Sequence, residues 1–511
     1  MGYMPEIMGD ILYHLNEEIH SLYSCALVNR LWCKLSIPIL WQDPFSFEQS
    51  PSFISNYFSS LGEDEKFGLK KCGVNFEYSE TLFDYARFLK VLDLSCLENK
   101  IKQWIDIEFV NSKLYNNYNS STYHIVNLLF KLFIESGATL HKLDLHFSEF
   151  SEFLKFSPEI FYSLGENKKF FSQLQDLSLG VISHYNIESV TTILKVVAKN
   201  TTKIEIFKLD EFYSNCESQS FHALFYALVR IIKSQEHLRQ FGLVGGEEFP
   251  IEFYGIISAL ESQKNSLKEV RLESCDYSEE FEILKNCKKL ETLRIRYCND
   301  DDLLEILNYK VRTLEIIDFG FEATTISILT KIIENSGLLL QRLMIDSTDE
   351  EIWEDSLLLG AIRSFCPNIT YLSISNIDFS TQLVELIGNL PKLQFLSLLC
   401  NGNISGEELK ILVMKFAEIL PLTLHYLDIR DAWLGRHIDI LFNHCNAPLK
   451  KLLIEHLHSK KNAKSLIDFC TRNKALKYVS IDRFLELNKK IRKEVKKYVT
   501  VVPYEHIVVT C

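Results

Sequence analysis

Residues 393–401 read Leu-Gln-Phe-Leu-Ser-Leu-Leu-Cys-Asn, with leucine at the first, fourth and sixth positions. Leu396 and Leu398 alternate with Ser397, as a β-strand with one buried face requires. Leu393 stands three residues earlier and is expected to close the preceding turn. This stretch therefore predicts a short strand whose alternate side chains enter a hydrophobic core.

The same spacing recurs along most of the chain, with Ile, Val or Phe replacing some leucines. The fourteen stretches begin at Leu89, Leu140, Leu174, Ile204, Leu238, Leu267, Leu290, Val311, Leu340, Ile369, Leu393, Leu424, Leu449 and Leu476. The segments between them switch to helical spacing, as Ile187, Val190 and Leu194 illustrate. Strand–helix units that cannot bury a core alone predict a repeat array, with parallel strands on the concave side and helices outside.

This pattern resembles the leucine-rich repeat, which implies an α/β solenoid over residues 81–511 that ends in a C-terminal cap. Cys275, Cys298 and Asn401 stand where that family has asparagine or cysteine, whereas Ser148 and Thr348 depart from it. We therefore expect the solenoid architecture with an incomplete asparagine ladder.

Residues 1–45 contain no repeat and instead show three short runs of helical spacing. Ile7, Ile11, Leu12 and Leu15 form the first run, directly after Pro5. Three small helices cannot bury all of their apolar side chains alone, so a partner surface is expected. We assign residues 1–45 to a helical module and residues 46–80 to a linker or cap.

The order and spacing of the apolar residues in this module resemble the F-box. Its pattern is matched by Pro-Glu-Ile at 5–7, Ile-Leu-x-x-Leu at 11–15, Leu-Val-x-x-x-Trp at 27–32 and Pro-x-Leu-Trp at 38–41. The resemblance implies docking onto the adaptor subunit of an SCF-type cullin–RING ubiquitin ligase. The adaptor-binding residues would be Pro5, Ile7, Ile11, Leu12, Leu15, Leu22, Leu27, Val28, Trp32, Pro38, Leu40 and Trp41.

Together the two resemblances imply the substrate-recognition subunit of such a ligase. The module would bind the adaptor, and through it the cullin, while the repeats bind an unidentified client protein. The alternative is a ligase-independent interaction scaffold whose N-terminal helices only cap the repeats. We expect a monomer within a hetero-complex.

The third, fifth and seventh positions of each repeat point away from the core, onto the concave surface. The third position is aromatic only in the last five repeats, at Tyr371, Phe395, Tyr426 and Tyr478. Adjacent parallel strands lie about 4.8 Å apart, so the first three rings should form a contiguous column. Exposed aromatic clusters are typical of binding hot spots, although mutual stacking to stiffen the sheet is an alternative. The candidate client-binding residues are Tyr371, Phe395, Leu399, Tyr426, Asp428, Arg430 and Tyr478.

Charged residues alternate along two central strands of the predicted sheet. We expect the following residues to face one another across these strands: Glu269, Arg271 and Glu273 on one, and Thr292, Arg294 and Arg296 on the next. Cross-strand ion pairing, such as Glu273 with Arg296, is the simplest interpretation of this pattern.

Composition limits the classes of partner and the cellular compartment that we expect for this chain. The net charge of −13 disfavours nucleic acid, because phosphate backbones are repelled. The longest apolar stretch, residues 124–134, is too short to span a bilayer, so no membrane partner is expected. Thirteen cysteines without a disulfide-like framework, and an acidic N-terminus unlike a secretory signal, favour the cytoplasm or nucleus.

Motifs that would indicate catalysis are missing from the sequence. It has no Cys-x-x-Cys, His-Glu-x-x-His, phosphate-binding glycine loop or Gly-x-Ser-x-Gly. We therefore expect no catalytic, cofactor-binding or metal-ligating residues, and a protein that is not an enzyme.

Overall fold

The fold was analysed in a computed structural model of the whole chain. The residues that it describes are 5–16, 18–46, 50–71, 74, 81–108, 118–146, 156–180, 187–212, 219–245, 253–298, 301–305, 311–318, 323–346, 357–401, 406–430, 437–454, 457, 459–481 and 489–509. The chain divides into two compact units, Met1–Leu267 and Lys268–Cys511. Each is described by itself.

The first unit begins with three helices, α1 (Pro5–Tyr13), α2 (Ile19–Ala26) and α3 (Arg30–Leu40), in the part assigned to the N-terminal module. Helix α3 packs against both α1 and α2. Asn29 caps α3, because its Oδ1 accepts hydrogen bonds from the backbone N–H groups of Leu31 and Trp32 at 2.9 and 3.0 Å. Because α3 contacts both of the other helices, the three helices form one module.

A short helical segment follows and covers the first repeats. It consists of η1 (Pro51–Ile54), α4 (Ser55–Phe58), α5 (Glu63–Lys71) and η2 (Tyr85–Phe88). The Tyr57 ring meets Phe133 with a centroid distance of 5.2 Å, and Phe58 meets Trp104 at 5.3 Å. Phe133 and Trp104 belong to helices of the first repeats, so this segment is a packed cap.

The rest of the first unit alternates strands and helices. In chain order these are β1 (Val91–Asp93), α6 (Leu94–Glu108), α8 (Tyr118–Glu135), β2 (Lys142–Leu145), α9 (Pro158–Glu166), β3 (Asp176–Leu179), α10 (Ile187–Asn200), β4 (Ile206–Phe212), α11 (Gln219–Ser234), β5 (Gln240–Gly245), α12 (Ile256–Ala259) and η3 (Leu260–Gln263). Strands β1 to β5 pair in parallel and in chain order.

The second unit repeats this alternation. Its elements are β6 (Glu269–Glu273), η4 (Glu279–Asn286), β7 (Thr292–Arg296), α13 (Asp301–Glu305), β8 (Thr313–Ile317), α14 (Ala323–Ser336), β9 (Arg342–Asp346), α15 (Leu357–Phe365), β10 (Tyr371–Asp378), α16 (Thr381–Gly388), β11 (Phe395–Asn401), α17 (Gly406–Ile419), β12 (Tyr426–Ile429), α18 (Ile438–His444), β13 (Lys451–Ile454), α19 (Lys460–Arg472), β14 (Tyr478–Ile481), α20 (Lys489–Val495), β15 (Thr500–Val501) and η8 (Tyr504–His506). Strands β6 to β15 are parallel and pair in chain order.

Each of the fourteen predicted stretches contains a strand that begins two residues after its first apolar residue. In the stretch around β11, Leu393, Leu396 and Leu398 are buried as predicted. Cys298 Sγ accepts a hydrogen bond from the backbone N–H of Cys275 at 3.4 Å, so these two cysteines make the inter-repeat contact expected of that position. The fold is therefore an α/β leucine-rich-repeat solenoid, as the sequence predicted.

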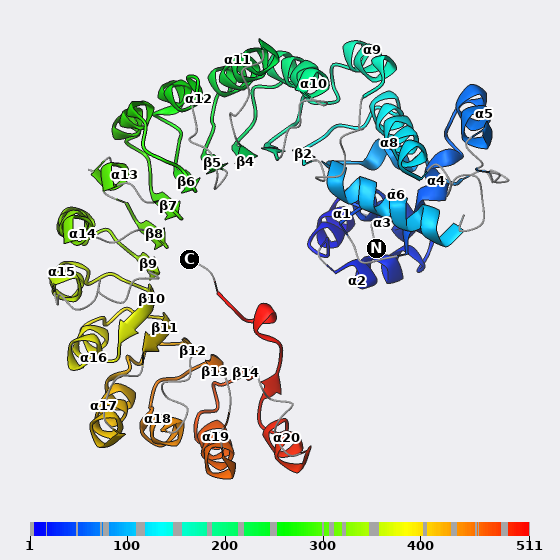
Figure 1. Cartoon of the computed structure of the whole chain (residues 1–511). Coiled ribbons are helices and arrows are strands. Elements are labelled where there is room, and N and C mark those ends of the chain that lie inside the picture. The colour runs from blue at the N-terminus through cyan, green and yellow to red at the C-terminus, as the bar shows by residue number, and fades with distance from the viewer. Residues whose placement is uncertain are drawn as a thin grey trace. The chain divides into compact units, whose positions relative to one another are not determined.

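Helices of the second unit lie on one side of its strands, and the opposite side, which we call the inner face, carries the C-terminal residues (Figure 1). Strand β15 was not predicted, because Tyr498 stands where earlier repeats have an aliphatic residue. Within the described residues, no helix combines the length and the apolar character needed to cross a bilayer. No group of His, Cys, Asp or Glu in these same parts is arranged to hold a metal ion.

Candidate protein-interaction surfaces

The N-terminal module exposes a concentration of large apolar side chains. Leu27, in the turn between α2 and α3, is 73% exposed, and its neighbour Val28 is 61% exposed. Ile7 and Ile11 lie one turn apart on α1, so they share a helix face. Isolated exposed apolar residues are ordinary, whereas several within one short module are typical of an interaction surface.

Two residues predicted to contact an adaptor lie inside the module instead. Leu12 is 1% exposed and Leu22 is fully buried, so both belong to its core. Neighbouring residues on a helix project roughly 100° apart, which turns Leu12 inward while Ile11 faces outward. The motif selected Leu12 because it does not distinguish the two faces of a helix, and Leu22 came from the helical spacing of the second run, which does not distinguish them either.

The remaining motif residues are partly buried. This group comprises Leu15, Trp32, Pro38, Leu40 and Trp41. Pro5 is the first residue of α1, as predicted for a proline at a helix start.

Among these, Trp41 turns toward the cap of its own chain. Its ring stacks on Tyr85 with a centroid distance of 4.0 Å and meets Tyr57 edge-on at 5.2 Å. Trp41 was predicted to bind the adaptor, but this position makes it an anchor between α3 and the cap.

Two exposed residues of the module were missed by the sequence reasoning. Tyr13 on α1 and Tyr23 on α2 are both more than half exposed. The F-box pattern prescribes no residue type at these positions, so the motif gave no reason to select them. Their exposure adds two aromatic side chains to the exposed apolar residues of the module.

The second candidate surface lies on the inner face of the second unit. Strand register pairs Tyr371 with Phe395 and Phe395 with Tyr426, and the ring centroids lie 6.3 and 5.9 Å apart. The predicted contiguous aromatic column is therefore present. Tyr478 is separated from it, because Lys451 on β13 stands between Tyr426 and Tyr478.

This aromatic column is covered rather than open. Tyr371 and Tyr426 are only 3% and 2% exposed, and Phe395 is partly buried. Residues 502–509, which we call the C-terminal segment, pack over them through Ile507 and neighbouring valines. The sequence reasoning missed this segment, although the run Ile507-Val-Val has the apolar character of a buried strand.

Asp428 and Arg430 flank the aromatic column, as predicted. Arg430 Nε and Nη2 donate to the two Asp428 carboxylate oxygens, both at 2.9 Å. The Arg430 guanidinium lies 4.8 Å from the centre of the Tyr504 ring in the C-terminal segment. Burial raises the pKa of the Tyr426 hydroxyl, and the nearby Asp428 carboxylate raises it further, so this tyrosine stays protonated as a hydrogen-bond donor.

Leu399 and Tyr478, the other two candidates for client binding, are exposed on β11 and β14.

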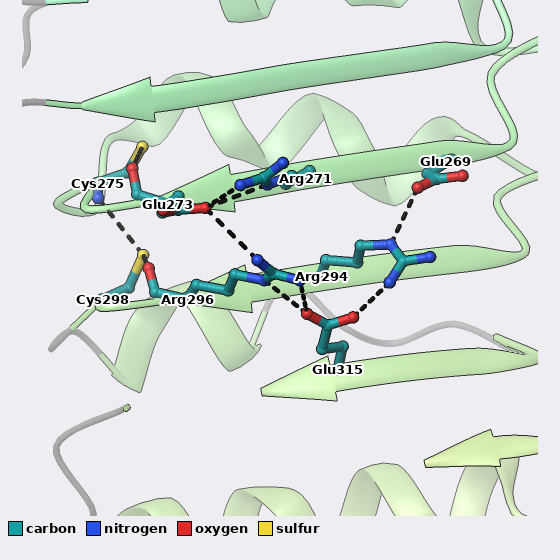
Figure 2. A network of polar contacts seen from close by, with 8 residues as sticks. All are labelled: Glu269, Arg271, Glu273, Cys275, Arg294, Arg296, Cys298 and Glu315. Carbon is teal, nitrogen blue, oxygen red and sulfur yellow. Dashed lines mark hydrogen bonds and ion pairs between the residues drawn. The ribbon is translucent and has the colours of Figure 1, made fainter. Parts of the chain in front are cut away.

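A network of charged side chains crosses β6, β7 and β8 (Figure 2). The predicted register is confirmed, and Glu273 lies 4.0 Å from Arg296. Arg294 also donates to Glu269, with an Nε–Oε1 distance of 3.0 Å. Glu315 on β8, which the sequence reasoning missed, pairs with both Arg294 and Arg296 and is fully buried.

Together with Arg271, which pairs with Glu273, the network contains three arginines and three glutamates. The charges cancel formally, so the network joins neighbouring strands and offers no net charge to a ligand.

Comparisons with known proteins concern the fold. No family model matches the chain, and no curated protein matches it either. A chain of the yeast Rad7–Elc1 complex is 13% identical over 79% of this chain and 98% of its own length, with a TM-score of 0.44. An internalin from Listeria monocytogenes is 14% identical over 73% of this chain and 88% of its own, with a TM-score of 0.33.

A leucine-rich-repeat protein from Leptospira interrogans is 13% identical over 73% of this chain and 91% of its own, with a TM-score of 0.30. All three TM-scores are below 0.5, so these likenesses carry no argument about this chain. Of the two surfaces described above, one is exposed and the other is covered by the chain itself.

Proposed function

We propose that this chain is the substrate-recognition subunit of an SCF-type ubiquitin ligase. The N-terminal module would dock onto the adaptor, and through it onto the cullin, and the repeats would hold a client protein. The chain would contribute proximity rather than a catalytic group, because holding two reactants together replaces an encounter in solution. Its many free cysteines, seven of them buried among the described residues, favour the cytoplasm or nucleus as the compartment.

One observation carries the proposal: exposed apolar side chains stand at F-box positions. Ile7, Ile11, Leu27 and Val28 match the motif, and each is more than half exposed. Burying one such side chain contributes about 1.5–3 kcal/mol, so four supply roughly 6–12 kcal/mol before the entropy of association is subtracted. Association itself costs about 4–15 kcal/mol, so a stable interface also needs contacts from the partly buried motif residues, such as Trp32.

The test replaces apolar side chains that are exposed and therefore unimportant for folding. A triple variant, Ile11→Glu, Leu27→Glu and Val28→Glu, is expected to lose adaptor and cullin in co-purification, because charges cannot be buried at an apolar interface. The matched control is Leu338→Glu with Leu422→Glu, which changes equally exposed leucines outside the module. The control should retain both proteins, and retention by the triple variant contradicts the proposal.

The alternative function is a ligase-independent scaffold whose N-terminal helices only cap the repeats. The packing of Trp41 and Phe45 favours it, since Trp41 stacks on Tyr85 and Phe45 meets Phe133 of α8 with a centroid distance of 6.1 Å. Under this alternative, neither adaptor nor cullin co-purifies with the wild-type chain. Deletion of residues 1–45 would then lower the thermal stability of the repeats and remove no partner.

A further inference from the structure

The C-terminal segment covers the aromatic column as a ligand would. Its backbone runs on the inner face of the strands of the second unit (Figure 1, red). Ile507 is buried against Tyr426 and Leu453, and Val502 and Val509 pack on the same cluster. Most third-position side chains on other strands, such as those on β6, β7 and β9, are only partly buried. The segment therefore accounts for the burial of Tyr426, and it contributes to that of Tyr371 together with Arg342, which lies over the Tyr371 ring.

Side chains at the end of this segment alternate between the column and solvent. Ile507 is 3% exposed, Val508 is 36% exposed, and Val509 is again partly buried against the column. Such alternation is the side-chain pattern of an extended chain. These residues directly follow the 3-10 turn η8 (Tyr504–His506), whose Tyr504 carbonyl accepts from the N–H groups of Ile507 and Val508. The inner face thus takes a tight turn followed by apolar side chains at alternate positions.

Backbone groups of the segment are held by two hydroxyls of the column. Tyr371 Oη donates to the carbonyl oxygen of Val509 at 3.1 Å, and Tyr426 Oη accepts from the N–H of Val509 at 3.4 Å. Both polar groups of one peptide residue are therefore satisfied by side chains from β10 and β12. Every peptide carries these groups, so this contact recognises the backbone rather than a particular side chain.

A second contact selects an aromatic residue three positions before Ile507. The guanidinium of Arg430, fixed by its paired bonds to Asp428, lies over the ring of Tyr504. Arginine over an aromatic face is an attractive cation–π arrangement. The segment thus presents an aromatic residue followed by apolar residues three and five positions later.

We propose that the inner face of β10–β13 is a binding site for a short peptide segment of this type, a tight turn followed by alternating apolar residues, and that the C-terminal segment is its tethered, exchangeable occupant. The partner is a stretch of a client protein with an aromatic residue three positions before the first of two alternate branched aliphatic residues. The C-terminal segment imitates that stretch and competes with it.

The tether explains how weak contacts can keep the column covered. Strand β15 ends at Val501, only a few residues before Ile507, so the segment cannot diffuse away from its site. Short tethers give effective concentrations on the order of millimolar. A partner binds only the fraction of molecules with an open column, so its apparent Kd rises by the inverse of that fraction.

This inference deepens the proposed function, since it names the chemistry of the client segment, and it rests on that function only in calling the partner a client. Occupation of the column can be measured without adaptor or ligase.

The experiment follows binding of a fluorescein-labelled peptide with the sequence of residues 500–509, by fluorescence anisotropy. The full-length chain is compared with a chain that ends at Val502 and with a full-length variant carrying Ile507→Asp and Val509→Asp. We expect both altered chains to bind the peptide at least tenfold more tightly than the wild type, because their columns are open. A peptide with the same two aspartates is the matched control and should not bind.

Two results would overturn the proposal: equal affinity for all three chains, or no binding to an altered chain whose circular dichroism matches the wild type. If the truncated chain fails to fold, the double variant decides the outcome, because it keeps the full length. Phe395→Ala in the double variant should weaken peptide binding again, which locates the peptide on the aromatic column.

Co-purification of the adaptor with the full-length chain is recorded in parallel. If the chain retains the adaptor but shows no peptide exchange, only this inference is contradicted. If the peptide exchanges but the chain never binds the adaptor, only the proposed ligase function is contradicted. The two proposals therefore fail separately.

Discussion

Glu315 connects two arginines at the centre of the charged network (Figure 2). Its carboxylate is fully buried and pairs with Arg294 and Arg296. Without this carboxylate, the two positive charges on β7 would lose the partner that they share. Removing one partner of a buried ion pair costs more than the pair contributes, because the remaining charge stays desolvated.

We therefore predict that Glu315→Ala lowers the free energy of unfolding by about 3–5 kcal/mol. Glu273→Ala, on the more exposed side of the same network, should cost less, about 1 kcal/mol. Urea denaturation followed by circular dichroism measures both. Equal losses would mean that burial does not distinguish the two glutamates.

His146 is the residue through which stability should depend on pH near neutrality. Its Nδ1 lies 2.8 Å from Asp144 Oδ1, and this hydrogen bond raises the pKa of His146 above its usual value. A raised pKa means that the charged form stabilises the fold. The contribution is complete below the unfolded-state pKa of about 6.5 and disappears as pH rises through the higher folded-state pKa.

We predict that His146→Gln lowers the melting temperature more at about pH 5.5 than at about pH 8.5. The control is Gly180→Ala, because a Cβ at position 180 would lie 2.0 Å from His146 Cδ2 and displace the ring from Asp144. Both variants should show the same reduced pH dependence in thermal scans. If the pH dependence of the melting temperature is unchanged in both variants, the His146–Asp144 pair does not cause it.

At the scale of elements, the third helix has two separate tasks. Its C-terminal neighbour Trp41 anchors the module on the cap, while the turn that precedes the helix exposes Leu27 and Val28. Capping and docking therefore use different residues, and a substitution can change one without the other.

We predict that Trp41→Ala lowers the free energy of unfolding by about 3–5 kcal/mol, as expected when a packed tryptophan leaves a cavity. Adaptor capture at a temperature where the chain stays folded should be unchanged. Loss of capture with unchanged stability would show that Trp41 acts at the interface after all. Denaturation curves and co-purification from the same preparation supply both measurements.

Elements of the repeats could be predicted because their signal is local. Leu393, Leu396 and Leu398 lie within six residues and define their strand without knowledge of the rest of the chain. Because the repeat fixes the register of neighbouring strands, the pairing of Glu273 with Arg296 could also be predicted. Helix faces were harder: Leu12 was assigned to the adaptor because the motif names residue types and not directions, and Leu22 because spacing alone does not say which side of a helix is covered.

At the scale of the whole molecule, contacts distant in sequence escaped prediction. Tyr371 and Val509 are 138 residues apart along the chain, and no periodicity links them. The aromatic column was found from the sequence, but its cover was not. Glu315 was predicted in part. The sequence predicted the strand that contains it, but its pairing with both Arg294 and Arg296 depends on side-chain geometry that the sequence does not show.

Strand β15, only two residues long, ends the parallel ladder of the second unit. Val502 still donates its N–H to the carbonyl of Val479 at 3.1 Å, but Pro503 follows and has no N–H to donate. A long terminal strand would present a row of unpaired backbone groups on which a second molecule could continue the sheet. The brief last strand and its proline therefore protect a repeat protein from polymerising through its own end.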